Sequence, residues 1–203
     1  MKRQIIDKGV HSGFLLIALF SITTLFLIVV FLFIEGIPIL DYVSIKEFVF
    51  GKYWYPTDDP ADFGILSLIL GSICVTLLSG IMAIPLGIMT AVYLAEIASP
   101  KVAEIVKPIV ELMASMPSVI IGFFGMVVLM AAGGAAMIPG SIFDPVRPLP
   151  ATIAAEMAEA PFGGEHYHAL FAIGIVLFVF TFIFNLIADY ISYKFRQVGE
   201  ASL

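Results

Sequence analysis

Long stretches without a charged side chain dominate this chain of 203 residues, and they cover 13–34, 64–95, 112–143 and 169–188. In the first stretch 17 of the 22 residues are Val, Ile, Leu or Phe, which favours its insertion into a bilayer by about 5 to 10 kcal/mol. A helix of roughly 20 apolar residues crosses the hydrocarbon core, because it bonds its own backbone groups. Each stretch therefore predicts a transmembrane helix.

The third stretch is broken up by Pro and Gly, so we predict its membrane part at 112–132 and a loop after it. The predicted fold is an all-α integral membrane protein, with a single transmembrane domain over 1–203 and about four spans. The predicted spans are 13–34, 64–95, 112–132 and 169–188, and the predicted external segments are 35–63 and 133–168.

The positions of Lys and Arg set the predicted orientation, because short basic segments stay in the cytoplasm. Seven of the ten basic residues lie in the N-terminal segment, in 96–111 and in the C-terminal tail. Both termini are therefore predicted to be cytoplasmic. The two segments assigned to the outside carry ten of the sixteen acidic residues, and there Tyr53, Trp54 and Tyr55 are expected near the membrane interface.

Composition supports a membrane protein and excludes several other classes. Apolar residues make up 61% of the chain and charged residues only 13%, whereas soluble domains carry roughly 25% charge. The net charge of −6 and the lack of a Lys/Arg-rich run argue against nucleic-acid binding. The lone Cys74 excludes an internal disulfide and a cysteine-cluster metal site, and we expect no cofactor.

Few polar residues fall within the predicted spans, and no Asp, Glu, Lys or Arg does. Asn185, near the inner end of the fourth span, has two open uses: a hydrogen bond to a neighbouring helix, or a place along a substrate path. Pro85 interrupts the second span and allows it to bend.

A stripe of small residues follows one face of the second span. Such a face lets another helix approach closely, and that helix could belong to this chain, to another subunit or to a permeation path. The stripe consists of Ser72, Thr76, Gly80, Ala83 and Gly87, continued by Ala91.

Two clusters in the outer segment 133–168 have residue types that can carry chemistry. Glu165, His166 and His168 suit zinc in type, but no second histidine pair accompanies them, so we expect no metal. Glu156 and Glu159 could form a carboxylate pair, although a solvated helix face is the simpler interpretation. With no G-x-S-x-G string present, the chain is not predicted to be an enzyme.

Four strings cover more than half of the chain: KYWYPTDDPADFGILSLILGSICVTLLSGIMAIPLGIMTAVYLAEIASP (52–100), PIVELMASMPSVIIGFFGMVVL (108–129), AMIPGSIFDPVRPLPATIAAEMAEA (136–160) and HYHALFAIGIVLF (166–178). Taken together they resemble the permease subunit of the phosphate ABC importers, the PstC type. The resemblance implies a partial ABC-importer permease fold. It also implies a prokaryotic plasma-membrane location and a role in the path by which phosphate crosses.

The sequence departs from that family in its middle. The family has about six helices, whereas four spans are predicted here. The family's cytoplasmic loop of the E-A-A-x-x-x-G type and its helix with a membrane-embedded Arg and Glu have no counterpart in this sequence. Around Met130 and Ala131 the chain passes from what resembles the third helix to what resembles the segment after the fifth. The resemblance therefore implies an internally shortened permease, and the junction preserves the predicted orientation.

The resemblance also implies partners: a second permease subunit, cytoplasmic ATPase subunits, an external phosphate-binding protein and the lipid bilayer. Arg147 could attract phosphate, contact the binding protein or pair with Asp144. Trp54, Asp58 and Asp59 are candidates for the docking surface, and Lys101, Glu104 and Lys107 for the side that faces the ATPase. The alternative is a small membrane protein that does not transport and that assists the assembly or regulation of a transporter.

Overall fold

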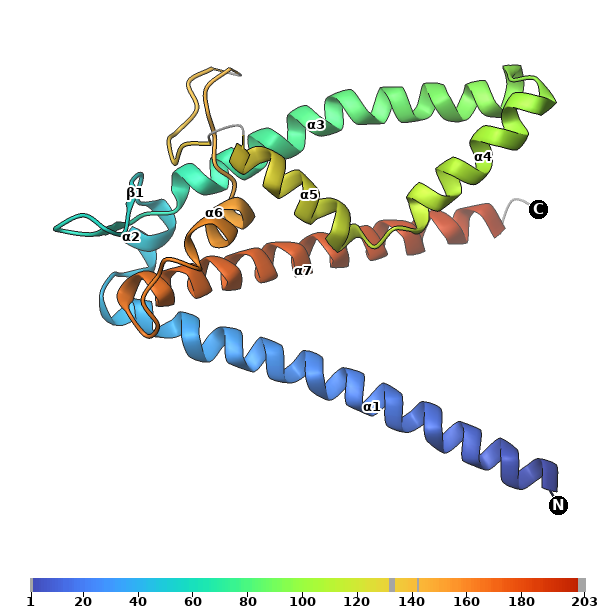
Figure 1. Cartoon of the computed structure of the whole chain (residues 1–203), viewed down its shortest axis with the longest axis horizontal. Coiled ribbons are helices and arrows are strands. Elements are labelled where there is room, and N and C mark those ends of the chain that lie inside the picture. The colour runs from blue at the N-terminus through green and yellow to red at the C-terminus, as the bar shows by residue number, and fades with distance from the viewer. Residues whose placement is uncertain (1, 132–133, 142, 201–203) are drawn as a thin grey trace. The chain divides into compact units, whose positions relative to one another are not determined.

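Helices make up most of the chain in the computed structural model, which describes residues 2–131, 134–141 and 143–200. This confirms the all-α prediction (Figure 1). In chain order the elements are α1 (Lys2–Gly36), η1 (Ile37–Asp41), α2 (Ile45–Phe50), β1 (Trp54–Tyr55), β2 (Asp62–Phe63), α3 (Leu66–Val92), η2 (Tyr93–Ile97), α4 (Pro100–Ser115), α5 (Ser118–Ala131), α6 (Leu149–Glu156) and α7 (Glu165–Glu200).

Three of the predicted spans lie in long helices. Within the described residues, Gly13–Asp41, Leu66–Ile97 and Glu165–Lys194 are long and apolar enough to cross a membrane. The helices run beyond the segments predicted from apolar runs, because a charged residue ends the contact with hydrocarbon without ending a helix. At 35 residues, α1 is about 52 Å long, against a hydrocarbon core of roughly 30 Å.

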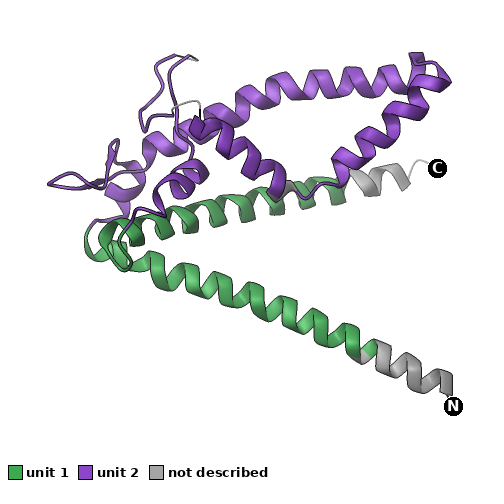
Figure 2. Ribbon diagram, in the orientation of Figure 1, with its two compact units in different colours: residues 1–42, 161–203 green, residues 43–160 purple. Residues whose placement is uncertain are grey.

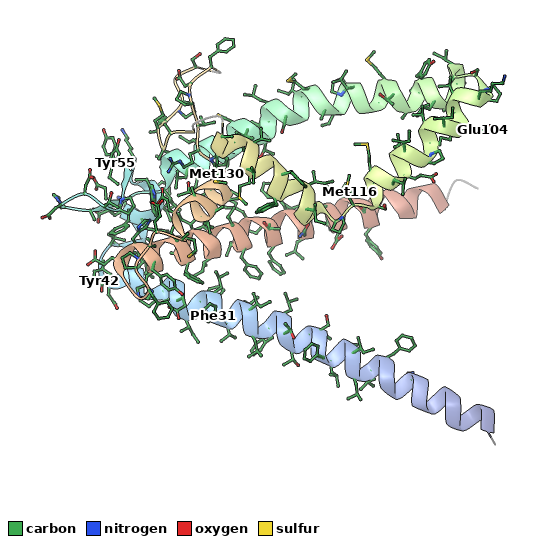
Figure 3. All side chains as sticks on the ribbon, in the orientation of Figure 1. Phe31, Tyr42, Tyr55, Glu104, Met116 and Met130 are labelled. Atoms are coloured by element: carbon green, nitrogen blue, oxygen red, sulfur yellow. The ribbon has the colours of Figure 1, made fainter. Side chains whose placement is uncertain are left out.

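The third predicted span, 112–132, is not one helix, and that prediction is corrected. The chain breaks at Met116, whose φ of −65° and ψ of 132° are extended, between α4 and α5 (Figure 3). Pro117 explains the break, because proline has no N–H to continue the helix and disfavours helical geometry in the residue before it. If α4 and α5 form one bent span, the chain crosses four times. The predicted boundary at 132 and 133 lies outside the described residues.

The chain divides into two compact units, residues 1–42 with 161–203 and residues 43–160, which Figure 2 colours separately. In the first unit, α1 packs on the N-terminal half of α7, where the rings of Phe31 and Phe171 meet edge to face at 5.5 Å. A side chain at Gly36 would come within 2.6 Å of Ile175 Cδ1, so glycine is what allows this close approach. The prediction of a single transmembrane domain stays a prediction.

The second unit carries a small lobe, formed by α2, β1 and β2, where the sequence predicts only an external segment. The strands β1 and β2 pair antiparallel, with Trp54 opposite Phe63 and Tyr55 opposite Asp62. The lobe is compact at Gly64, where an added Cβ would lie 2.4 Å from the Gly51 carbonyl carbon. The short helix α6 packs against both α3 and α5.

Candidate functional site

Three polar side chains from separate parts of the second unit meet in a cluster, which we call the outer clamp: Trp54, Arg147 and Glu156. The Arg147 Nη1 atom donates to Glu156 Oε1 at 2.7 Å, and the Trp54 indole N–H donates to Glu156 Oε2 at 2.9 Å. The Glu156 side chain is 16% exposed and that of Arg147 31%. One carboxylate at the end of α6 thus receives hydrogen bonds from strand β1 and from the segment before α6.

The outer clamp ties the beginning of α3 to the segment that follows α5. The Arg147 Nε atom donates to the carbonyl of Gly134 at 3.2 Å, and Gly134 lies three residues after the end of α5. On the other side, a Cβ on Gly71 of α3 would sit 3.0 Å from the Arg147 carbonyl oxygen. The Leu149 N–H also donates to Ser72 Oγ at 2.9 Å, so two spans are held together at one end.

This arrangement answers the open question about Arg147. Its ion-pair partner is Glu156, and the alternative pair with Asp144 is wrong: the Asp144 carboxylate instead accepts the N–H groups of Gly140 and Ser141 at 2.8 Å each. Glu156 is likewise not part of a solvated helix face, which corrects the simpler interpretation of Glu156 and Glu159. Of these two glutamates, Glu159 alone is exposed to solvent.

A cavity of about 130 Å³ lies beside Arg147 and is lined mainly by apolar groups, Leu129, Met130, Val146, Pro148 and Ala151 among them. The Arg147 guanidinium is already neutralised by Glu156, and an anion bound there would compete with that carboxylate. We therefore interpret the cavity and the outer clamp as a structural arrangement that fixes the ends of the helices. They do not resemble a phosphate-binding site.

The predicted docking residues separate into two groups. Trp54 is only 3% exposed and packs edge to face on Phe63 at 6.2 Å, so its expected place on a docking surface or at the membrane interface is corrected. Asp58 and Asp59 are exposed in the turn between β1 and β2.

The cluster of Glu165, His166 and His168 is not drawn together as a set. His168 Nδ1 lies 2.7 Å from the carbonyl oxygen of Glu35 and 3.8 Å from its Oε2, so this side chain links α7 to α1. Within the described ranges no three His, Cys, Asp or Glu side chains form a group that could hold a metal ion.

The small-residue stripe of α3 is used by this chain only at its first turns. Ser72 accepts from Leu149, whereas a Cβ at Gly80 would meet only Ile84 of the same helix, at 3.9 Å, and one at Gly87 would meet nothing within 4 Å. Thr76 donates to its own helix at Ser72, and Ala83 and Ala91 are exposed. Packing inside this chain therefore does not account for the second half of the stripe.

The remaining candidates are exposed. Lys101, Glu104 and Lys107 share the polar side of α4, where Figure 3 labels Glu104, and Asn185 is exposed on α7. Their proposed roles stay predictions.

Sequence reasoning missed Glu156 as the centre of the outer clamp and Glu35 as the partner of His168. The signal for Glu156 was weak. Trp54, the only tryptophan of the chain, and Arg147, the only basic residue of segment 133–168, each need a polar partner when they are buried. Nothing in the local pattern connects them, because Trp54 and Glu156 are 102 residues apart.

Comparison with known proteins adds the family context. No protein-family model matches the chain, and no solved structure matches it. The probable ABC transporter permease protein YqgH of Bacillus subtilis is 35% identical over 153 residues, which cover 70% of this chain and 49% of the relative. The phosphate transport system permease protein PstC of Mesorhizobium japonicum is 32% identical over 83 residues, 41% of this chain and 25% of the relative.

A third relative, the probable phosphate transport system permease protein PstC of Methanocaldococcus jannaschii, is 27% identical over 115 residues, 55% of this chain and 36% of the relative. The chain thus spans about half the length, or less, of the curated relatives it matches. Together with its long apolar helices, these matches place it in a prokaryotic cell membrane as a multi-pass protein similar to ABC transporter permeases.

Proposed function

We propose that this chain is a shortened membrane subunit, of the PstC type, of an ABC importer for inorganic phosphate. The observation that carries the proposal is the 35% identity to a permease over 70% of the chain, joined to PstC matches whose names specify phosphate. The helices suited to span a membrane, and the pair α4 and α5, support it. In this role the chain forms part of a path that a separate ATPase drives.

The proposed orientation puts both termini and α4 in the cytoplasm and the outer clamp outside. Lys101, Glu104 and Lys107 then face the ATPase subunits, and the β1–β2 hairpin faces an external phosphate-binding protein. A second permease subunit completes the path, and the unused half of the α3 stripe, around Gly80 and Gly87, is the surface we assign to it.

The physics of phosphate makes such a partner necessary. An anion near the bilayer centre requires fixed positive charge or aimed backbone N–H groups, and the sequences of the predicted spans contain no Lys or Arg. Arg147, the one basic residue of segment 133–168, is bound to Glu156. We therefore expect that this chain alone does not move phosphate.

Reconstitution in lipid vesicles tests the proposal. We expect uptake of radiolabelled phosphate by vesicles that contain this chain, a second permease subunit, the ATPase and the binding protein. ATP is supplied on the side of the membrane where the ATPase is bound. Vesicles with the chain alone should match protein-free vesicles. Uptake by the chain alone would refute the need for partners, and failure both to bind the ATPase and to support uptake would refute the permease role. Competition by sulfate or arsenate measures the selectivity.

A further inference from the structure

The β1–β2 hairpin has two chemically different faces. One face is buried, since Trp54 and Phe63 oppose each other there and are 3% and 5% exposed. The other face carries Tyr55, its cross-strand partner Asp62, and Tyr53, which directly precedes β1 and whose ring stacks on that of Tyr55. Because successive side chains of a strand point to opposite sides, burying Trp54 commits both tyrosines to the outer face.

The outer face forms an aromatic and acidic patch, which we call the hairpin patch: Tyr53, Tyr55 and Asp62, with Asp58 and Asp59 in the adjoining turn. The two tyrosine rings stack with centroids 6.2 Å apart and are 60% and 49% exposed. Figure 3 labels Tyr55 on this hairpin. Within the described part of the chain, the Asp62 carboxylate forms no hydrogen bond and no ion pair.

Lipid is a poor occupant for the hairpin patch. Desolvating a charge in hydrocarbon costs at least about 2.5 to 3.5 kcal/mol, and the same hairpin exposes three carboxylates, one of them paired across the strands with Tyr55. The same negative charge repels anionic headgroups. An unpaired carboxylate next to exposed aromatic rings instead complements a cation.

We propose that the hairpin patch docks a soluble protein through arginine side chains on that protein. The proposal rests on the proposed function for its orientation, which places the patch outside the membrane. A guanidinium stacks flat on a tyrosine ring and donates two parallel hydrogen bonds to a carboxylate. Tyr55 and Asp62 are cross-strand neighbours, whose Cβ atoms lie about 4.5 to 5.5 Å apart. One arginine can therefore use both.

The other patch residues extend this recognition. Tyr53 offers a second ring beside the first, and Asp58 and Asp59 add negative charge at the rim, which raises the rate of encounter with a basic surface. Below the patch, the outer clamp holds Trp54 and keeps the hairpin fixed, so little conformational entropy is lost when a partner binds.

Binding of short peptides to the full chain in nanodiscs of uncharged lipid tests the chemistry. We expect an arginine-rich peptide to bind more tightly than a lysine-rich peptide of equal length, since lysine cannot form the planar fork. Tyr55→Ala and Asp62→Asn should each weaken arginine-peptide binding by about tenfold. The matched controls are Tyr42→Ala, an exposed tyrosine in the other unit, and Glu159→Gln, an exposed acid; both should bind as the wild type does.

The fluorescence of Trp54, the only tryptophan of the chain, verifies that each variant keeps a folded hairpin. A second arm uses the purified phosphate-binding protein, whose binding should be weakened by the same two substitutions. The proposal is overturned if the two substitutions leave binding unchanged, if lysine and arginine peptides bind equally, or if neither probe binds the wild type. Association with the ATPase does not involve the hairpin, so it reports separately on the proposed permease role.

Discussion

At the scale of single residues, the decisive feature is a carboxylate that two distant donors share. Glu156 satisfies both Arg147 and Trp54, and a hydrogen bond to a charged group contributes about 1.5 to 3 kcal/mol when it is well buried. Arg147 is about one-third exposed, so solvent screening reduces its share of that stabilisation. The outer clamp thus fixes the geometry of the hairpin and also stabilises it.

Glu156→Ala should loosen the hairpin. It leaves the Trp54 indole without this acceptor and Arg147 without its ion-pair partner, so we expect a loss of about 1 to 3 kcal/mol in the lobe. The measurement is the emission of Trp54 during thermal unfolding in detergent, which should be red-shifted and should change at a lower temperature. Glu159→Ala removes an exposed acid of the same segment and serves as the control. Identical melting of the two variants would contradict the role of the outer clamp.

At the scale of elements, close approach depends on particular glycines and breaks depend on a particular proline. Gly36 and Gly174 lie where α1 and α7 meet, and a Cβ on Gly174 would come within 2.8 Å of Leu32 Cδ1. Pro85 and Pro108 lie in the interiors of continuous helices, whereas Pro117 lies between α4 and α5 and separates them. The residue before Pro117 has left helical geometry, and this is what ends α4.

Gly36→Val should separate the ends of α1 and α7, because its side chain would overlap Ile175 and the Ala172 backbone, the latter at 3.0 Å. Disulfide trapping measures the effect. With Cys74→Ala as the background, Leu32→Cys and Gly174→Cys should cross-link, since a Cβ on Gly174 would lie 4.0 Å from Leu32 Cγ, and Gly36→Val should lower the yield several-fold. Gly13→Val is the control, since a Cβ there meets nothing within 4 Å. Equal yields for both valine variants would show that the close approach is not required.

Gly87→Leu tests the unused half of the α3 stripe. The space around Gly87 is open within this chain, so we expect normal insertion and folding but loss of association with the second permease subunit. Co-purification of the two subunits from membranes provides the measurement. Leu86→Ala, which shortens a neighbouring exposed side chain off the stripe, should leave association intact. Association that persists in Gly87→Leu would show that this half of the stripe is not the contact with the second permease subunit.

At the scale of the whole molecule, the distribution of charge gives a topology that can be tested without any transport assay. Acidic residues gather in 35–63 and 133–168, whereas basic residues gather at the two ends and in 96–111. By the positive-inside rule, the basic segments lie in the cytoplasm and the acidic segments 35–63 and 133–168 lie outside, so the side of each segment can be tested separately.

Single cysteines in a Cys74→Ala background should therefore label from opposite sides. We expect Asp58→Cys to react with a membrane-impermeant thiol reagent added to intact cells, and Lys101→Cys to react only after the membrane is opened. Both positions are exposed in the structure, so burial does not confuse the comparison. Labelling of both positions from the same side would overturn the proposed orientation.

The amino-acid pattern was sufficient to assign this protein to lipid and to locate three of its long apolar helices. Burial in lipid depends on composition over about 20 consecutive residues, a local property that the runs at 13–34, 64–95 and 169–188 display directly. The broken third span was also encoded locally, at Pro117, although only the backbone geometry of Met116 revealed that the helix ends there.

The roles of the polar residues became clear from the folded chain alone: some bind one another, and others stay exposed. The local pattern predicts other roles for Trp54, Arg147 and Glu156, and it groups His168 with its sequence neighbours, whereas in the fold His168 lies beside Glu35. A hydrogen bond forms between groups that the fold brings within about 3 Å, and separations of 102 and 133 residues leave no trace in a local pattern. Burial of Trp54 in turn decided that Tyr53 and Tyr55 face outward.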